Sequence, residues 1–257
     1  NLDAEVAVFQ SASELIAAVS SGSVDFAMTD PMVTASLYAS GANVQIRWVT
    51  LGADASQGRF GIMTADPDIK SLTDLAGVPV GVGSNTILEY VMDTLFERVG
   101  VTADQVKTEE LQKLPVRYQA MATGTVKAAA LPASLLALGE ASGFTVVADD
   151  TTGGNISQSV MISCKNAIST DTVNAFARAW DAAVAHINAN PDSYRALLAQ
   201  KASLPESIAQ TYAVSSYPAA ELPEQHMIDA VLTWMANKGY LATSISYDAA
   251  TGCFQGR

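Results

Sequence analysis

Short polar segments follow five of the predicted strands, and these segments carry the side chains that could do chemistry. They offer hydroxyl, amide and carboxyl groups, with one arginine, Arg59, and with no lysine, histidine or cysteine. Such groups suit reversible binding of a small polar or anionic molecule, because covalent and acid–base catalysis need a tuned nucleophile or base. The five segments are residues 29–32, 52–59, 83–86, 132–134 and 151–159.

One of these segments opens a helix. Gly81 and Gly83 begin a glycine-rich pattern, but Thr86 stands where a dinucleotide-binding motif requires its third glycine. Ser84, Asn85 and Thr86 instead start a helix whose free N–H groups and positive dipole end could face a ligand. Simple N-capping by Ser84 or Asn85 is the alternative, and one residue can serve both roles.

The chain carries no sequence motif of an enzyme or of a metal site. The P-loop, HExxH, CxxC and GxSxG patterns are absent, and His186 and His226 both fall within predicted helices. Cys164 and Cys253 are too few for a multi-cysteine zinc site, and they are either buried thiols or one disulfide. We therefore expect no catalysis, no cofactor and no metal.

Strands and helices alternate through the first two-thirds of the chain, which predicts βαβ units and a mainly parallel sheet. Capping patterns mark the helix starts: Ser11 with Glu14, Asp30 with Pro31, and Ser71 with Asp74. The final third is predicted to be helical. The predicted strands are residues 5–9, 24–29, 45–51, 60–64, 78–82, 106–111, 145–148 and 157–163, with one more directly before Pro132.

Two stretches of the chain resemble each other. Residues 18–31 and 120–132 both run from a helix end through glycine, a small hydroxyl residue and valine into an apolar strand that ends in proline. Chance is one explanation, because glycine often follows a helix. The other is that two lobes share the same βαβ plan.

The composition indicates a globular chain and limits its partners. Of 257 residues, 49% are hydrophobic and 16% are charged, and the formal net charge is −12. This acidic balance argues against nucleic acid and against docking on an anionic membrane surface, since both need basic groups. No apolar stretch reaches the roughly 18 residues of a membrane span.

Four stretches carry a family resemblance: SGSVDFAMTDP, IKSLTDLAGVPVGVGSNT, LPVRYQAMATGTVKAAALPASLLAL and AFARAWDAAVAHINANPDSYRALL. In these the chain resembles the solute-binding proteins of bacterial ABC transporters, in the nitrate, sulfonate, taurine and thiamine-pyrimidine-precursor (NMT1-like) group. The resemblance implies an α/β, two-lobed periplasmic-binding-protein type II fold. Its two βαβ lobes would be joined by crossing strands near residues 59–65 and 157–163.

The resemblance also implies lobe boundaries and a site between the lobes. Residues 1–63 and 163–257 would form the first lobe, and residues 64–162 the second. Related chains have one further strand and helix before the strand predicted at residues 5–9, so we expect this unit to be missing from the chain. The implied ligand-binding residues are Asp30, Pro31, Ser56, Gln57, Ser84, Asn85, Thr86, Pro132, Ser134, Asn155 and Gln158.

By this resemblance the protein captures a small solute between its lobes and delivers it to the permease of an ABC transporter. It would act as a monomer in the periplasm or outside the cell, and a lipid anchor on the precursor stays open. The alternative is an enzyme of menaquinone or pyrimidine biosynthesis on the same fold. That alternative would need a tuned histidine, cysteine or carboxylate in the cleft.

Overall fold

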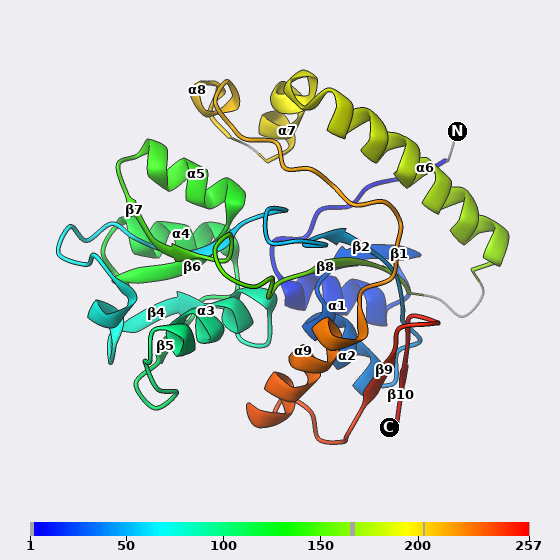
Figure 1. The fold of residues 1–257 in the computed structure, drawn as a ribbon, viewed down its shortest axis with the longest axis horizontal. Coiled ribbons are helices and arrows are strands. Elements are labelled where there is room, and N and C mark those ends of the chain that lie inside the picture. Colours follow the sequence, from blue (N-terminus) through cyan, green and yellow to red (C-terminus); the bar gives the residue numbers. More distant parts are fainter. Residues whose placement is uncertain (1–2, 165–167, 203, 257) are drawn as a thin grey trace.

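The computed structural model describes residues 3–164, 168–202 and 204–256. Two sheets stand beside each other, each with helices on both faces (Figure 1). The first has the order β1-β8-β2, the second has the order β5-β4-β6-β3-β7, and β9 pairs with β10 near the C-terminus. The strands are β1 (Phe26–Thr29), β2 (Gln45–Leu51), β3 (Phe60–Thr64), β4 (Pro79–Val82), β5 (Lys107–Glu110), β6 (Ala128–Pro132), β7 (Thr145–Asp149), β8 (Ser159–Ser163), β9 (Ser246–Asp248) and β10 (Cys253–Gln255).

The prediction of mainly parallel pairing is only partly correct. Strand β4 pairs in parallel with β5 and β6, whereas β8 lies antiparallel between β1 and β2, and β3 lies antiparallel between β6 and β7. The strands of the βα units therefore share a direction within each sheet, as predicted. The two exceptions, β3 and β8, are the predicted crossing strands, and each runs against its neighbours because it enters its sheet from the other one.

Local capping patterns set the helix starts as predicted. The Glu14 N–H donates to Ser11 Oγ at 3.2 Å, and the Gln10 N–H donates to the Glu14 carboxylate at 2.9 Å. Ser71 and Asp74 form the predicted capping box of a short 3-10 helix, η1 (Leu72–Leu75). The α-helices are α1 (Ala12–Ser20), α2 (Pro31–Ala39), α3 (Ile87–Arg98), α4 (Leu114–Ala122), α5 (Ala133–Ala141), α6 (Thr170–Ala189), α7 (Arg195–Lys201), α8 (Glu206–Ala209) and α9 (Gln225–Asn237), with the 3-10 helix η2 (Pro191–Tyr194) between α6 and α7.

The prediction of a strand at residues 5–9 is wrong. This segment pairs with no strand in the described part of the chain, and Val6 and Val8 are 85% and 79% exposed. A strand needs a neighbour to satisfy its backbone groups, so alternating apolar residues alone do not create one.

Alternation along the strands builds a core on both faces of the second sheet. In β3, Ile62 packs in the large core that also holds α3 and the first sheet, whereas Met63 packs with Met121 and Leu136 of α4 and α5. Successive strand residues point to opposite faces, which explains this division. On the first sheet, Trp48 lies edge-on to Phe176 of α6, with ring centroids 5.2 Å apart.

The C-terminal segments return to the first sheet. Helix α9 packs against α2, and the Ile46 N–H of β2 donates to the Gly252 carbonyl at 2.9 Å. Cys164 is buried and Cys253 is half-buried, and no disulfide joins them. Among the described residues, no helix combines the length and the apolar character that a membrane crossing would need.

Candidate functional site

Asp30 forms hydrogen bonds with helices of both sheets. It is the N-cap of α2, where Oδ1 accepts the Val33 N–H at 2.8 Å, and its Oδ2 accepts the Ile87 N–H of α3 at 3.1 Å. Helix α2 packs on the first sheet and α3 packs on the second. One carboxylate, only 8% exposed, therefore caps two helices that belong to different sheets.

The protonation of Asp30 is unusual for an aspartate. Burial raises the pKa of its carboxyl to about 6, and the backbone hydrogen bonds from Val33, Ile87 and Met32 act in the opposite direction. Desolvation prevails because the carboxylate has hydrogen-bond donors but no cation among the groups that shift it. The sequence pattern did not reveal a tuned carboxyl group here. Both oxygens are held by helix N-termini, which is the geometry of a cap.

We expect Asp30 to make folding pH-dependent in a specific way. Relative to an Asp30→Asn variant, the free energy of unfolding of the wild type should fall by about 2–3 kcal/mol between about pH 4 and pH 7. Between the unfolded value of 3.8 and the folded value of about 6, the folded protein holds a proton that the unfolded chain has released, so rising pH favours unfolding. Urea unfolding of both proteins across this range measures the difference, and a difference that does not change with pH would contradict it.

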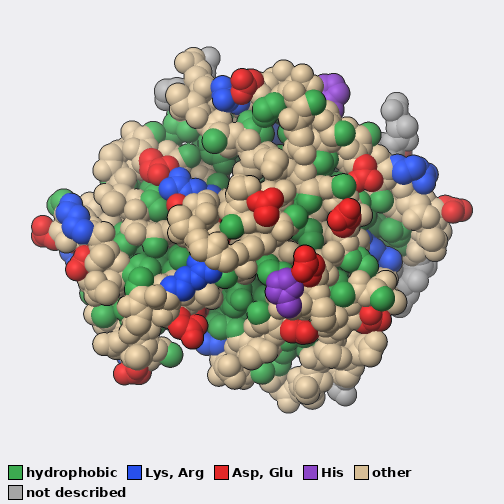
Figure 2. All heavy atoms as spheres, viewed as in Figure 1, with side chains coloured by type: hydrophobic (Ala, Val, Ile, Leu, Met, Phe, Trp, Pro, Cys, Tyr) green, Lys and Arg blue, Asp and Glu red, His purple; other side chains and the backbone are tan. Residues whose placement is uncertain are grey.

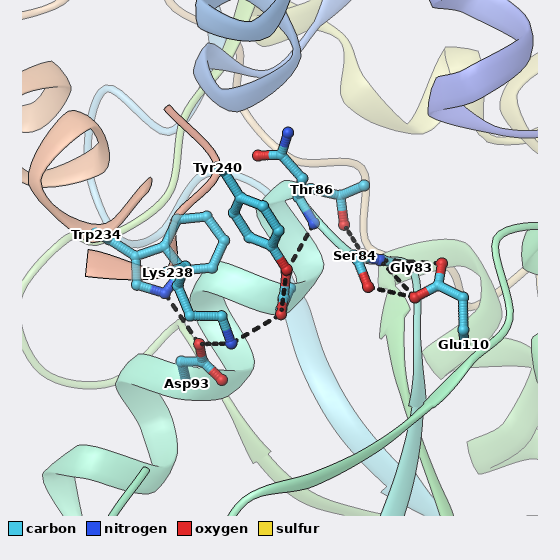
Figure 3. Close-up of polar contacts among 10 residues, drawn as sticks. Gly83, Ser84, Thr86, Asp93, Glu110, Trp234, Lys238 and Tyr240 are labelled. Atoms are coloured by element: carbon cyan, nitrogen blue, oxygen red, sulfur yellow. Dashed lines mark hydrogen bonds and ion pairs between the residues drawn. The ribbon is translucent and has the colours of Figure 1, made fainter. Parts of the chain in front are cut away.

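The turn that opens α3 is built as a set of hydrogen bonds. Thr86 is the N-cap, and its Oγ1 donates to the Gly83 carbonyl at 2.7 Å. Asn85 holds the left-handed backbone conformation, with φ of 56°, and its Nδ2 donates to Ser36 Oγ of α2 at 2.7 Å. The Ser84 N–H and Oγ both donate to the Glu110 carboxylate, as Figure 3 shows. The predicted residues Ser84, Asn85 and Thr86 thus form the turn directly before Ile87, whose N–H donates to Asp30.

A second group of charges joins α3 to α9 and to the residues that follow α9. Lys238, just after α9, lies 2.9 Å from Glu89 and 3.0 Å from Asp93 of α3. Tyr240 donates its hydroxyl to Glu89 at 2.8 Å, and Trp234 donates its indole N–H to Asp93 at 2.9 Å (Figure 3). Sequence reasoning missed this group, because no local pattern connects Lys238 with residues about 150 positions earlier.

We call these contacts between the two sheets' helices the inter-sheet junction. It consists of Asp30 and Ser36 on the α2 side, Trp234, Lys238 and Tyr240 on the α9 side, and Asn85, Ile87, Glu89 and Asp93 on the α3 side.

Asn155 and Gln158 lie at the carboxyl end of β2. Both donate a side-chain N–H to the Gly52 carbonyl, at 2.7 Å from Asn155 and 3.3 Å from Gln158. Strand pairing brings this point near Asp30, because Thr29 of β1 and Leu51 of β2 pair with Val160 and Ser159 of β8. Asn155 and Gln158 therefore hydrogen-bond one connection between the sheets to the other.

Within the part of the chain that the structure describes, no hydrogen bond or ion pair joins the remaining predicted site residues to the junction. Ser56 donates its N–H to Asp54 at 2.8 Å, and Gln57 accepts the Ala53 N–H at 3.0 Å, within one exposed loop. Pro132 is the N-cap of α5 and pairs with Phe60 of β3. Pro31 is the buried first residue of α2, and Ser134 lies in the first turn of α5.

Arg59, the one arginine of the polar segments, is already neutralised. It lies 2.7 Å from Asp149 and 3.0 Å from Glu140, and the pKa of Asp149 is lowered by hydrogen bonds from Thr151 and Arg59 that outweigh its burial. Beside it, burial raises the pKa of Asp150, whose carboxylate accepts the Phe60 N–H at 2.8 Å and the Ser157 hydroxyl. Among the described residues, no group of three or more acidic, histidine or cysteine side chains is placed to hold a metal ion.

Known proteins give the chain a family and a fold. Residues 1–194 match the model of a family described as NMT1/THI5 like. No curated protein matches the sequence. The alkanesulfonate-binding protein SsuA from Xanthomonas axonopodis pv. citri, solved with MOPS, is 15% identical, with a TM-score of 0.76 over 91% of this chain and 82% of that one.

Two further solved structures have a similar fold. The periplasmic aliphatic sulphonate-binding protein SsuA from Escherichia coli is 16% identical, with a TM-score of 0.73 over 91% of this chain and 81% of that one. The ligand-binding component of an ABC-type import system from Staphylococcus aureus, solved with zinc, is 15% identical, with a TM-score of 0.71 over 92% and 81%. At these identities the similarity shows the fold, which is the predicted periplasmic-binding-protein fold.

Proposed function

This chain belongs to the NMT1/THI5-like family, and we propose from that premise that it is the solute-binding protein of an ABC importer. One observation carries the proposal. The N-termini of α2 and α3 meet at the carboxyl edges of two separate sheets and are bridged by Asp30. Ligands of open α/β sheets bind outside the carboxyl ends of strands, so the inter-sheet junction is the proposed solute site.

Capture of the solute would use the two connections between the sheets as a hinge. Residues 52–59 and 150–158 would be the segments that bend, and the body that holds the first sheet would move against the body that holds the second. The lobe boundaries would therefore fall a few residues earlier than predicted, because β3 belongs to the second sheet and β8 to the first. In the described arrangement the two sides touch directly, through Asp30 with Ile87 and Asn85 with Ser36. A solute that contacts both sides would favour the closed population, because it makes both sets of contacts only there.

The partners follow from this role. The closed, loaded form would present the solute to a membrane permease, outside the cytoplasm, without catalysing a reaction. A role in import is also what the name of the similar Staphylococcus aureus protein suggests, and the similar Escherichia coli protein is named as a periplasmic binding protein. The enzyme alternative has less support, because the one strongly shifted carboxyl at the junction, Asp30, is engaged by two backbone amides.

We expect one class of small solute to stabilise the protein. A solute at 100 times its dissociation constant should add about 2.7 kcal/mol to the free energy of unfolding. Thermal melting with taurine, ethanesulfonate, nitrate, 4-aminopyrimidine and benzamidine tests this expectation. The emission of Trp234, which bonds to Asp93 across the junction, should shift with the same solute.

A Trp234→Phe variant is the matched control for the fluorescence. Trp48 and Trp180 lie together on the far face of the first sheet, with ring centroids 6.0 Å apart, so they should not report on the junction. The variant should keep the thermal shift and lose the emission change. If none of the solutes raises the melting temperature, the proposed function is wrong for these solute classes.

A further inference from the structure

The amides of the turn that opens α3 are already occupied by carboxylates of the protein. The Ser84 N–H donates to Glu110 at 3.2 Å, the Asn85 N–H donates to Glu89 at 2.6 Å, and the Ile87 N–H donates to Asp30 at 3.1 Å. The three acids come from β5, α3 and the N-cap of α2. A helix N-terminus binds an anion through free N–H groups, and here an anion of the protein holds each of these three.

Two buried acceptor atoms, one on this turn and one on the segment that leads into β8, lack a partner among the described residues. Gln158 is 6% exposed, and because its Nε2 donates to the Gly52 carbonyl, its unpartnered atom is the oxygen Oε1. Asn85 Oδ1, on the turn itself, is likewise buried without a partner. A buried acceptor without a donor costs about 1–3 kcal/mol, so both atoms call for a hydrogen-bond donor that the described residues do not supply.

The cations of the adjoining elements are engaged as well. Lys238 contacts Glu89 and Asp93, and Arg59 contacts Glu140 and Asp149. Arg117 lies beneath Gly83 and is 2% exposed. Its guanidinium donates hydrogen bonds to three backbone carbonyls, those of Leu111, Gln112 and Ala130. The carboxylates of Asp30, Glu89, Asp93 and Glu110 here outnumber the two cations, Lys238 and Arg117. An incoming sulfonate would therefore meet a negative balance of charge, which disfavours it electrostatically.

We propose that the solute of this protein presents an N–H donor to the junction, as an amine or amidine does, and that Asp30, Glu89 and Glu110 exclude sulfonates and other strong anions. This inference rests on the proposed function, since it names the ligand class of the same site. It separates this chain from the sulfonate-binding proteins that share its fold. The three carboxylates would accept hydrogen bonds from the N–H groups of the solute. The side-chain oxygens of Gln158 and Asn85 would be further acceptors.

Benzamidine and benzenesulfonate test the inference, because they share one ring and carry opposite charges. Isothermal titration of the wild-type protein should detect benzamidine at an affinity at least ten times that of benzenesulfonate. Asp30→Asn keeps a capping side chain but removes the charge, so it should weaken benzamidine binding at least tenfold and strengthen benzenesulfonate binding. Glu110→Gln, at an exposed position, should likewise weaken benzamidine binding and strengthen benzenesulfonate binding, which keeps the test decisive even if the Asp30 variant folds poorly.

Asp68→Asn makes the same chemical change on an exposed loop at the opposite end of β3 and should leave both affinities unchanged. The inference is overturned if the wild type binds benzenesulfonate, or any solute without an N–H donor, more tightly than benzamidine. It is also overturned if the two charge-removing variants behave like Asp68→Asn. Those results would leave the solute-binding role intact, whereas failure of every solute to bind would contradict both proposals.

Discussion

Replacing Lys238 with methionine should lower the free energy of unfolding by about 3–4 kcal/mol. The change leaves the buried carboxylate of Glu89, which is 3% exposed, and that of Asp93, which is 18% exposed, without their shared cation. Tyr240 and the Asn85 N–H still donate to Glu89, but neutral hydrogen bonds do not replace an ammonium group between two carboxylates. Because Lys238 follows α9 and both acids lie on α3, the loss also weakens the contact between the two sheets' helices.

Urea unfolding measures this loss, and the chain supplies its own control. Lys113 makes an ion pair with Glu14 at 2.9 Å, but its side chain is 58% exposed, so Lys113→Met should cost less than about 1 kcal/mol. A double variant, Lys238→Met with Glu89→Gln, should recover part of the loss because one uncompensated charge is gone. Equal effects of Lys238→Met and Lys113→Met would contradict the account.

Gly52→Ala should be nearly as damaging, at about 3–4 kcal/mol. Gly52 has a φ of +87°, and an added Cβ would lie 2.1 Å from the backbone oxygen of Ser157. The clash is with backbone on the other connection between the sheets, so it cannot be relieved by a side-chain rotation. It would also pull the Gly52 carbonyl away from Asn155 and Gln158.

Gly22→Ala is the control for Gly52→Ala. Gly22 has a similar φ of +72°, but nothing lies within 4 Å of its added Cβ, so only the backbone cost of about 1–2 kcal/mol remains. Thermal and urea unfolding of the two variants separate strain from steric clash. If the two variants lose equal stability, the close approach of the two connections is not what constrains residue 52.

The parts of the fold that the sequence predicts are those decided by neighbours in the chain. Ser11 and Glu14 lie three residues apart, as do Ser71 and Asp74, so both capping patterns can be recognised from the sequence. The turn at Ser84–Thr86 was recognisable for the same reason, since a strand end and a helix start are both local signals. Contacts of this range need no knowledge of the tertiary fold.

What the sequence did not reveal depends on segments that are far apart. The second role of Asp30, as a cap of α3, depends on a residue 57 positions away, and Lys238 contacts residues farther away still. The antiparallel insertion of β3 and β8 likewise leaves no local pattern. Ser56, Gln57, Pro132 and Ser134 stay predictions as ligand contacts, because the polarity of a loop does not say where it points.

The position of β8 has a consequence for how the chain is made. It is the middle strand of the first sheet, so β1 and β2 have no partner in that sheet until residues 159–163 have been synthesised. At about 5–20 residues per second, the first two strands wait roughly 5–20 seconds for the strand that joins them. All five strands of the second sheet lie between Phe60 and Asp149, so that sheet can form during the wait and then deliver β8 to the first. Synthesis from the N-terminus thus favours folding of the second sheet before the first, even though the first two strands of the first sheet are made earlier.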